Sequence, residues 1–165
     1  MPKTISIIVA VAADNGIGYQ NRLLTHISAD LKRFKQITKG HPVVMGRNTW
    51  FSLPNRPLPN RKNIVITNIQ GEVFEGAETV YSIEEAIAQM PENEESFIIG
   101  GAMIYKQFFG IAHKLYLTKM HKTFPADTFF PEVLPSEWDE TSREEVLNDE
   151  QAGLAYSFLN LERKR

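Results

Sequence analysis

Residues 96–109 have the sequence SFIIGGAMIYKQFF, and the rest of the chain can be arranged around this stretch. Phe97-Ile98-Ile99 is a short apolar run rich in β-branched residues, which predicts a strand buried on both faces. Gly100-Gly101 follows, and apolar residues then recur at helical spacing from Ala102 to Phe109. The stretch therefore predicts a strand, a tight turn and a helix. Glycines let a ligand approach the unpaired N–H groups at the helix start, which suits a pyrophosphate, although a plain strand-to-helix turn has the same pattern.

The composition is that of an ordinary globular protein. The 165 residues are 42% hydrophobic and 23% charged, and we expect them to form a single domain, residues 1–165. The formal net charge of −2 provides no basic field for nucleic acid. No apolar run approaches the roughly 20 residues that span a bilayer, so we expect no membrane partner. The absence of cysteine excludes disulfides, thiolate catalysis and cysteine-based metal sites, and is compatible with a reducing compartment.

The N-terminal segment MPKTISIIVAVAADNG allows two interpretations. Its single lysine, short apolar run and alanine-rich end are features of a secretory signal. The run is rich in isoleucine and valine, however, and we expect a first buried strand from Ile5 to Ala12. Gly16-x-Gly18 follows, but Asn21 stands where the dinucleotide-binding fingerprint requires a third glycine. We therefore expect a long functional loop from Ala13 to Ile27 instead of a Rossmann turn.

A helix is predicted over residues 28–39, with Ser28 as its N-cap. Its inward stripe contains Leu31 and Phe34, and Asp30 lies on the same side. An acidic residue in the first helical turn is favoured by the helix dipole alone, so a purely structural role for Asp30 stays open. A carboxylate on the apolar side of a helix is also partly removed from water. Its pKa should therefore be raised, which is typical of a functional acid.

The strand, glycine and helix pattern occurs a second time. A strand predicted over residues 42–45 ends in Gly46-Arg47-Asn48-Thr49, and a helix is predicted from Thr49 to Leu53. The arginine adds a guanidinium that can bind phosphate in a bidentate fork.

The connection from Pro54 to Lys62 is stiffened by its prolines, which forbid regular structure. Arg56 and Arg61 lie in this connection. Such charged clusters are usually only solvated, but a rigid loop with two arginines can also hold a carboxylate.

Alternating strands and helices predict an α/β fold with a mainly parallel sheet. The last strand is expected to run antiparallel to a neighbour. The remaining predicted elements are strands over residues 63–67, 79–81, 114–120 and 155–162, a helix capped by Ser82 that runs to Gln89, and a turn-rich connection from Thr123 to Pro131.

Four motifs occur in an order that resembles bacterial dihydrofolate reductases. They are SADLKRFK, PVVMGRNTW, RPLPNRKNIVIT and FIIGGAMIYKQF, and residues 126–131 partly match a fifth. The resemblance covers nearly the whole chain. It implies the single-domain, three-layer dihydrofolate-reductase-like fold, with a mainly parallel central sheet, an antiparallel C-terminal strand and flanking helices.

The resemblance also implies an activity. It is the NADPH-dependent reduction of 7,8-dihydrofolate to 5,6,7,8-tetrahydrofolate, by hydride transfer to C6 and protonation at N5. This oxidoreductase activity supplies one-carbon metabolism and is a target of antifolates. We expect a cytoplasmic enzyme, and a monomer because no element has a clear extra apolar face.

A role for each matching residue follows from the same resemblance. Asp30 and Thr118 are implied as catalytic: Asp30 binds the pterin amidine edge and helps to supply the proton, and Thr118 orients its carboxylate. Arg61 holds the glutamate carboxylate of folate, with Arg56 nearby. The other implied substrate contacts are Ile8, Leu31, Phe34, Leu53 and Ile99.

The implied cofactor is NADPH. Arg47 would bind the ribose 2′-phosphate together with Thr67 and Asn68, and a guanidinium there favours NADPH over NADH. The two helix N-termini would hold the pyrophosphate, and backbone groups of Ala10 and Ile17 would meet the nicotinamide carboxamide. The complete set of implied cofactor contacts is Ala10, Ile17, Gly18, Gly46, Arg47, Asn48, Thr49, Thr67, Asn68, Tyr81, Gly100, Gly101, Ala102, Met103, Ile104 and Tyr105.

Two positions depart from the family pattern. Leu24 and Thr25 stand where a Pro-Trp pair is usual, so the indole that commonly holds an active-site water is missing, which affects proton delivery and inhibitor fit. Ala126 stands where bacterial members often have glycine.

Two other functions are alternatives for this sequence. The pyrimidine reductases of riboflavin synthesis share the fold but lack the carboxylate on the first helix and the arginine-rich clamp. A non-catalytic nucleotide-binding module would bind NADPH without turnover.

Overall fold

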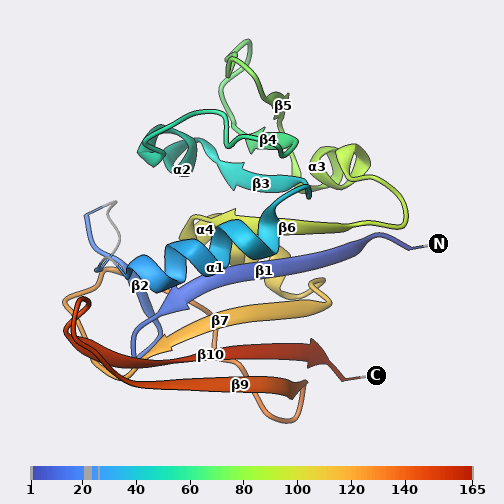
Figure 1. Cartoon of the computed structure of the whole chain (residues 1–165). Helices are drawn as coiled ribbons and strands as arrows, with labels where there is room; N and C mark the ends of the chain where they lie inside the picture. The colour runs from blue at the N-terminus through green and yellow to red at the C-terminus, as the bar shows by residue number, and fades with distance from the viewer. Residues whose placement is uncertain (1, 21–23, 26, 165) are drawn as a thin grey trace.

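The computed structural model describes residues 2–20, 24, 25 and 27–164, and it is an α/β structure (Figure 1). None of the helices in these residues has the length and apolar character needed to cross a membrane. The helices are α1 (Ser28–Thr38), α2 (Arg47–Ser52), α3 (Ile83–Gln89) and α4 (Ala102–Phe109). The strands are β1 (Thr4–Val11), β2 (Gly16–Gly18), β3 (Val43–Gly46), β4 (Asn63–Ile66), β5 (Glu78–Val80), β6 (Glu95–Gly100), β7 (Lys114–Met120), β8 (Thr128–Phe129), β9 (Trp138–Asp149) and β10 (Leu154–Arg163).

Eight strands form the main sheet in the order β5-β4-β3-β6-β1-β7-β10-β9. The strands from β5 to β7 are parallel to their neighbours, and β10 pairs antiparallel with both β7 and β9. The first strand of the chain lies at the centre, where Thr4 pairs with Glu95 of β6 and Ala10 pairs with Thr118 of β7. The mainly parallel sheet with an antiparallel C-terminal strand is the predicted architecture, and it is confirmed.

Alternating residues of β1 divide the core between the two faces of the sheet. Ile7 and Val9 belong to a core cluster with residues of α3 and α4, which we call the α4-side core. Ile8 points to the opposite face, into a cluster with Trp50 of α2 and Phe34 of α1, which we call the α1-side core. The sheet is therefore the middle of three layers, and Figure 1 shows α1 lying in front of the sheet, roughly along β1.

The sequence interpretation needs correction at the starts of two helices. Ser28 was expected to be an N-cap, but it is the first residue of α1, and Ile27 is the cap without a side-chain capping bond. The second helix was expected to begin at Thr49, whereas α2 begins at Arg47 directly after Gly46. By contrast, Ser82 caps α3 as predicted, because its hydroxyl accepts a hydrogen bond from the Glu85 N–H at 3.0 Å.

Three strands were not predicted. β9 is 12 residues long, and only Trp138 in it is fully buried, so it lacks the apolar alternation that identifies a strand. β2 and β8 are very short and pair only with each other, inside the segments interpreted as a loop and a turn-rich connection. Their pairing joins the segment after β1 to the segment after β7.

Candidate active site

The first polar pair of the site joins α1 to β7. The Thr118 hydroxyl donates a hydrogen bond to Asp30 Oδ1, across 88 positions of sequence. Thr118 is only 1% exposed, and burial of Asp30 is the main reason that the pKa of its carboxyl is raised. The Thr118 hydrogen bond and the charge of Arg33 act in the opposite direction without reversing the effect. The expectation that burial raises this pKa is therefore confirmed.

Apolar side chains of the predicted substrate site come from β1, α1, β6 and the residue that follows α2. Ile8, Phe34, Leu53 and Ile99 all pack in the α1-side core, so the structure brings together four of the predicted substrate contacts. Leu31 was expected to point into the core with them, but it is 47% exposed. Leu31 follows Asp30 directly on α1, so its apolar side chain lies at the surface near the carboxylate.

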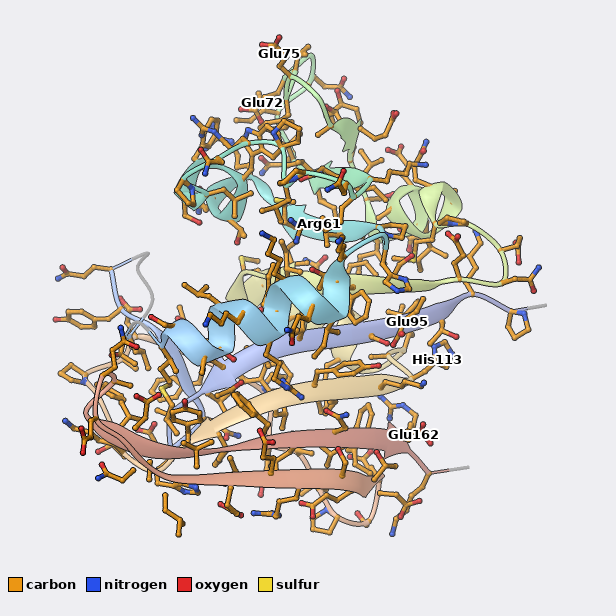
Figure 2. The ribbon with its side chains drawn as sticks, in the orientation of Figure 1. Arg61, Glu72, Glu75, Glu95, His113 and Glu162 are labelled. Atoms are coloured by element: carbon orange, nitrogen blue, oxygen red, sulfur yellow. The ribbon has the colours of Figure 1, made fainter. Side chains whose placement is uncertain are left out.

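Arg61 is anchored at the C-terminal end of α1 (Figure 2). Its Nη1 donates to the Thr38 hydroxyl at 3.0 Å, and its Nε donates to the Pro59 carbonyl at 2.9 Å. The guanidinium carbon lies 6.0 Å from the centre of the Phe34 ring. Arg61 is thus held beside Phe34 of the α1-side core, and its remaining guanidinium N–H groups are available as donors. Arg56, expected beside it, has its guanidinium 5.5 Å from the Phe51 ring centre.

The two glycine turns lie side by side at the carboxyl ends of β3 and β6, where Met45 pairs with Gly100. Gly100 has φ +129°, a conformation that disfavours other residues, and a Cβ there would lie 3.3 Å from Thr49 Oγ1. A Cβ at Gly46 would lie 3.0 Å from Ile104 Cγ1. A Cβ at either position would press against these side chains, so the glycines let the two strand-to-helix turns pack closely at this edge.

Tyr105 connects the same region to the central strand. Its buried hydroxyl donates to the Ile8 carbonyl at 2.9 Å, and burial raises its pKa so that it remains a neutral donor. Ile104 is buried beside it, whereas Met103 is 74% exposed. The first turn of α4 therefore has one residue on the surface and two in the core.

Arg47 has a partner that the sequence interpretation did not include. Its Nε lies 3.1 and 3.2 Å from the two Glu72 oxygens, and its Nη2 lies 2.9 Å from Oε2. The Thr67 hydroxyl donates to Glu72 Oε1 at 2.5 Å. These donors hold the pKa of Glu72 below its usual range. The structure therefore brings the predicted residues Arg47 and Thr67 together, around a carboxylate of the same chain.

Further side chains lie around Arg47 and Thr67. Phe51, which the sequence interpretation did not include, is half exposed, and the Arg47 guanidinium lies 5.1 Å from its ring centre. The Tyr81 hydroxyl accepts a hydrogen bond from the Gly71 N–H at 3.3 Å, and Asn48 and Asn68 are exposed.

The family model described as "Dihydrofolate reductase" matches residues 4–163. The chain belongs to the dihydrofolate reductase family. The dihydrofolate reductase of Bacillus subtilis is 43% identical over 160 residues, covering 97% of this chain and 95% of that protein. The dihydrofolate reductase of Neisseria gonorrhoeae is 43% identical over 156 residues, covering 94% and 96%. A solved dihydrofolate reductase from Enterococcus faecalis, complexed with NADP(H), has a TM-score of 0.89 at 33% identity and covers 98% of this chain and 97% of its own.

Within this dihydrofolate reductase fold, the loop after β1 is tied to the segment that contains β8. The Asp127 N–H donates to the Gly18 carbonyl at 2.9 Å, and Asp127 Oδ2 accepts from the Gln20 N–H at 2.9 Å. A Cβ at Gly16 would lie only 2.9 Å from the Ala126 Cβ. Ala126, which departs from the family pattern, therefore fits only because its neighbour is glycine.

The remaining loop predictions can be placed in part. Ala10 and Ile17 are half-buried, and Ile17 packs against the α4-side core. Leu24 and Thr25 are also half-buried, and Leu24 packs against a third apolar cluster that contains Ile27. Asn21 lies outside the described residues.

Proposed function

We propose that this chain reduces 7,8-dihydrofolate to 5,6,7,8-tetrahydrofolate with NADPH, and that Asp30 and Thr118 act in the proton transfer. The observation that carries the proposal is the half-buried Asp30 carboxyl with its raised pKa, held by a hydroxyl on β7. Membership of the dihydrofolate reductase family supports the reaction.

Asp30 would bind the edge of the pterin ring where two adjacent N–H groups meet its two carboxylate oxygens. Because its pKa is raised, the carboxyl holds a proton at a higher pH than an exposed aspartate does, as a proton donor toward N5 requires. Thr118 would act as a positioning residue, since its hydroxyl donates a hydrogen bond to the Asp30 carboxylate.

The rest of dihydrofolate would lie between α1 and the segment that contains Leu53. Leu31 and Phe34 would cover the rings from α1, and backbone groups of Ile8 and Ile99 would line the pterin pocket. Arg61 would bind the glutamate carboxylate in a bidentate fork, because its anchoring by Thr38 leaves further N–H donors available.

NADPH, when bound, supplies the hydride that reaches C6 of the pterin. The two strand-to-helix turns would receive its pyrophosphate together, because they lie side by side at the carboxyl ends of β3 and β6. The backbone N–H groups of Gly46 to Thr49 and Gly101 to Met103 would bind the pyrophosphate. Arg47 would bind the 2′-phosphate. The other contacts would come from Ala10, Ile17, Gly18, Thr67, Asn68, Tyr81, Ile104 and Tyr105.

The proposal includes a single domain that works as a cytoplasmic monomer. One sheet contains strands from Thr4 to Arg163, which supports a single domain. The edge strand β5 is only three residues long, and the edge strand β9 is highly charged, which disfavours pairing with a second copy. The absence of cysteine agrees with a reducing compartment.

The test is NADPH oxidation by the purified protein, followed as the loss of reduced-nicotinamide absorbance on addition of dihydrofolate. We expect rapid oxidation that requires both components and yields tetrahydrofolate. Binding of NADPH without oxidation would overturn the proposal, and the pyrimidine substrate of riboflavin synthesis would then be tried.

A further inference from the structure

Arg47 and Thr67 form a built anion site that the chain fills with its own carboxylate. β3 and β4 are parallel neighbours, and Gly46 pairs with Ile66 at their carboxyl ends. The residues that directly follow these two positions are Arg47 and Thr67, so the sheet itself places the guanidinium beside the hydroxyl. Both donate to Glu72, whose side chain is only 15% exposed.

The loop after β4 is folded so that Glu72 returns to this edge. The Ile69 N–H donates to the Thr67 hydroxyl at 3.2 Å, and the Glu72 N–H donates to the Ile69 carbonyl at 3.3 Å. Gly71, with φ +78°, turns the chain between them. Glu75 lies farther out on the same loop, and Figure 2 shows it at the outer tip while Glu72 lies nearer to α2. The position of Glu72 is thus fixed by its own turn.

A guanidinium fork and a hydroxyl bind a carboxylate and a phosphate with the same donors. Glu72 already accepts from Nε and Nη2 of Arg47 and from the Thr67 hydroxyl, and a phosphate at the same donors would be repelled by its carboxylate. A nucleotide with a ribose 2′-phosphate therefore competes with Glu72 for these donors. A nucleotide with a free 2′-hydroxyl need not do so, because a carboxylate can accept a hydrogen bond from that hydroxyl, as acidic residues do in NAD-binding proteins.

We propose that Glu72 determines cofactor selectivity by competing with the 2′-phosphate for Arg47 and Thr67. The inference rests on the proposed function, since it assigns these two residues to the cofactor. Glu72 lowers the affinity for NADPH and leaves the affinity for NADH unchanged or slightly higher. Arg47 has a second contact that would remain without Glu72, because its guanidinium also lies over the Phe51 ring at 5.1 Å.

The test compares Glu72→Gln with the matched control Glu75→Gln. Both variants lose one negative charge from the same loop, so they change the net charge equally, but of these two carboxylates only Glu72 accepts a hydrogen bond from Arg47 in the described part of the chain. The dissociation constants of NADPH and NADH are measured by calorimetry with the whole protein. Adenosine 2′,5′-bisphosphate and adenosine 5′-phosphate, which lack nicotinamide, report the 2′-phosphate site without any catalytic step.

Removing the competing carboxylate should tighten NADPH and adenosine 2′,5′-bisphosphate by about fivefold in Glu72→Gln, as expected for release of one well-aligned, partly exposed ion pair. NADH and adenosine 5′-phosphate should not tighten, and Glu75→Gln should resemble the unmodified chain. Weaker NADPH binding in Glu72→Gln would mean that Glu72 only holds Arg47 in place, and equal effects in both variants would mean that only loop charge matters. Either result overturns the inference.

The same titrations distinguish a failure of the proposed function from a failure of this inference. If the proposed function is wrong, neither NADPH nor adenosine 2′,5′-bisphosphate binds the unmodified chain. If both bind and the two variants do not differ, the cofactor assignment stands and the role of Glu72 is wrong.

Discussion

Asp30 and Thr118 share a hydrogen bond although one lies in the first turn of α1 and the other on β7. The orientation of the Asp30 carboxylate is fixed by the Thr118 hydroxyl on the sheet, while α1 sets the position of its backbone. Changes at either residue should therefore affect the chemistry of the carboxyl more than the fold.

Asp30→Asn should lower turnover by roughly 10²–10⁴-fold, because an amide cannot deliver the proton that a carboxyl with a raised pKa holds. NADPH affinity should change little, since the cofactor contacts lie elsewhere. Steady-state oxidation of NADPH by dihydrofolate and a binding titration check the two expectations. Turnover close to that of the unmodified chain at neutral pH would remove Asp30 from the mechanism.

The same substitution should stabilise the protein at neutral pH. The pKa of Asp30 is raised by burial, so its protonated form contributes stability below its ordinary pKa of 3.8, and this is lost as pH rises through the folded-state pKa. Asparagine does not titrate. The midpoint temperature of Asp30→Asn should therefore exceed that of the unmodified chain at neutral pH, and the difference should shrink as pH falls toward 3.8. An equal difference at every pH would contradict this origin.

Thr118→Val should reduce turnover by roughly 10–100-fold, because the carboxylate loses its orientation. It should also move the pH–rate profile upward, since the Thr118 hydrogen bond lowers the pKa of Asp30 and its loss raises that pKa further. Thr118→Ser keeps the hydroxyl and should restore the original profile. A profile unchanged in the valine variant would leave Thr118 with a packing role only.

Arg61→Ala should weaken dihydrofolate binding by about 100-fold, as expected when one member of a hydrogen-bonded charge pair is truncated. A reduced pterin without the glutamate tail should bind almost as before. Equilibrium titrations with the two ligands make the comparison. If both lose affinity equally, the substitution acts through the Thr38 contact and the end of α1 rather than through the substrate carboxylate.

Gly16→Ala should destabilise the native state by about 1–3 kcal/mol through overpacking, because the new Cβ would lie 2.9 Å from the Ala126 Cβ. Combining it with Ala126→Gly should recover most of the loss. Urea unfolding of the single and double variants measures this coupling. Additive effects would show that the two positions do not contact each other.

The strands that pack on the core were predictable from sequence, and the exposed edge strand β9 was not. The apolar run at Phe97 and the alternation from Lys114 to Met120 identify β6 and β7, because packing on the core fixes their pattern. β9 is an edge strand whose side chains, such as Arg143, mostly face solvent, so its sequence contains no comparable signal.

Some residues of the candidate site were also predictable from sequence, and others were not. Asp30 was identifiable because it lies on the apolar side of a helix. The partner of Arg47 was not, because the loop after β4 offers Glu72 and Glu75 and no pattern distinguishes them. The choice depends on the turn at Gly71 and on the neighbouring strand ends, which are properties of the folded chain.

The central place of β1 also has a consequence for synthesis. β1 pairs only with β6 and β7 in the main sheet, starting with Thr4 opposite Glu95. At about 5–20 residues per second, the ribosome needs roughly 5–20 seconds to make the chain between these partners. During that interval the segment TISIIVAV is an apolar strand without a neighbour. A nascent chain that stops before β6 therefore exposes the most apolar part of the sheet, and its escape from aggregation depends on how quickly translation resumes.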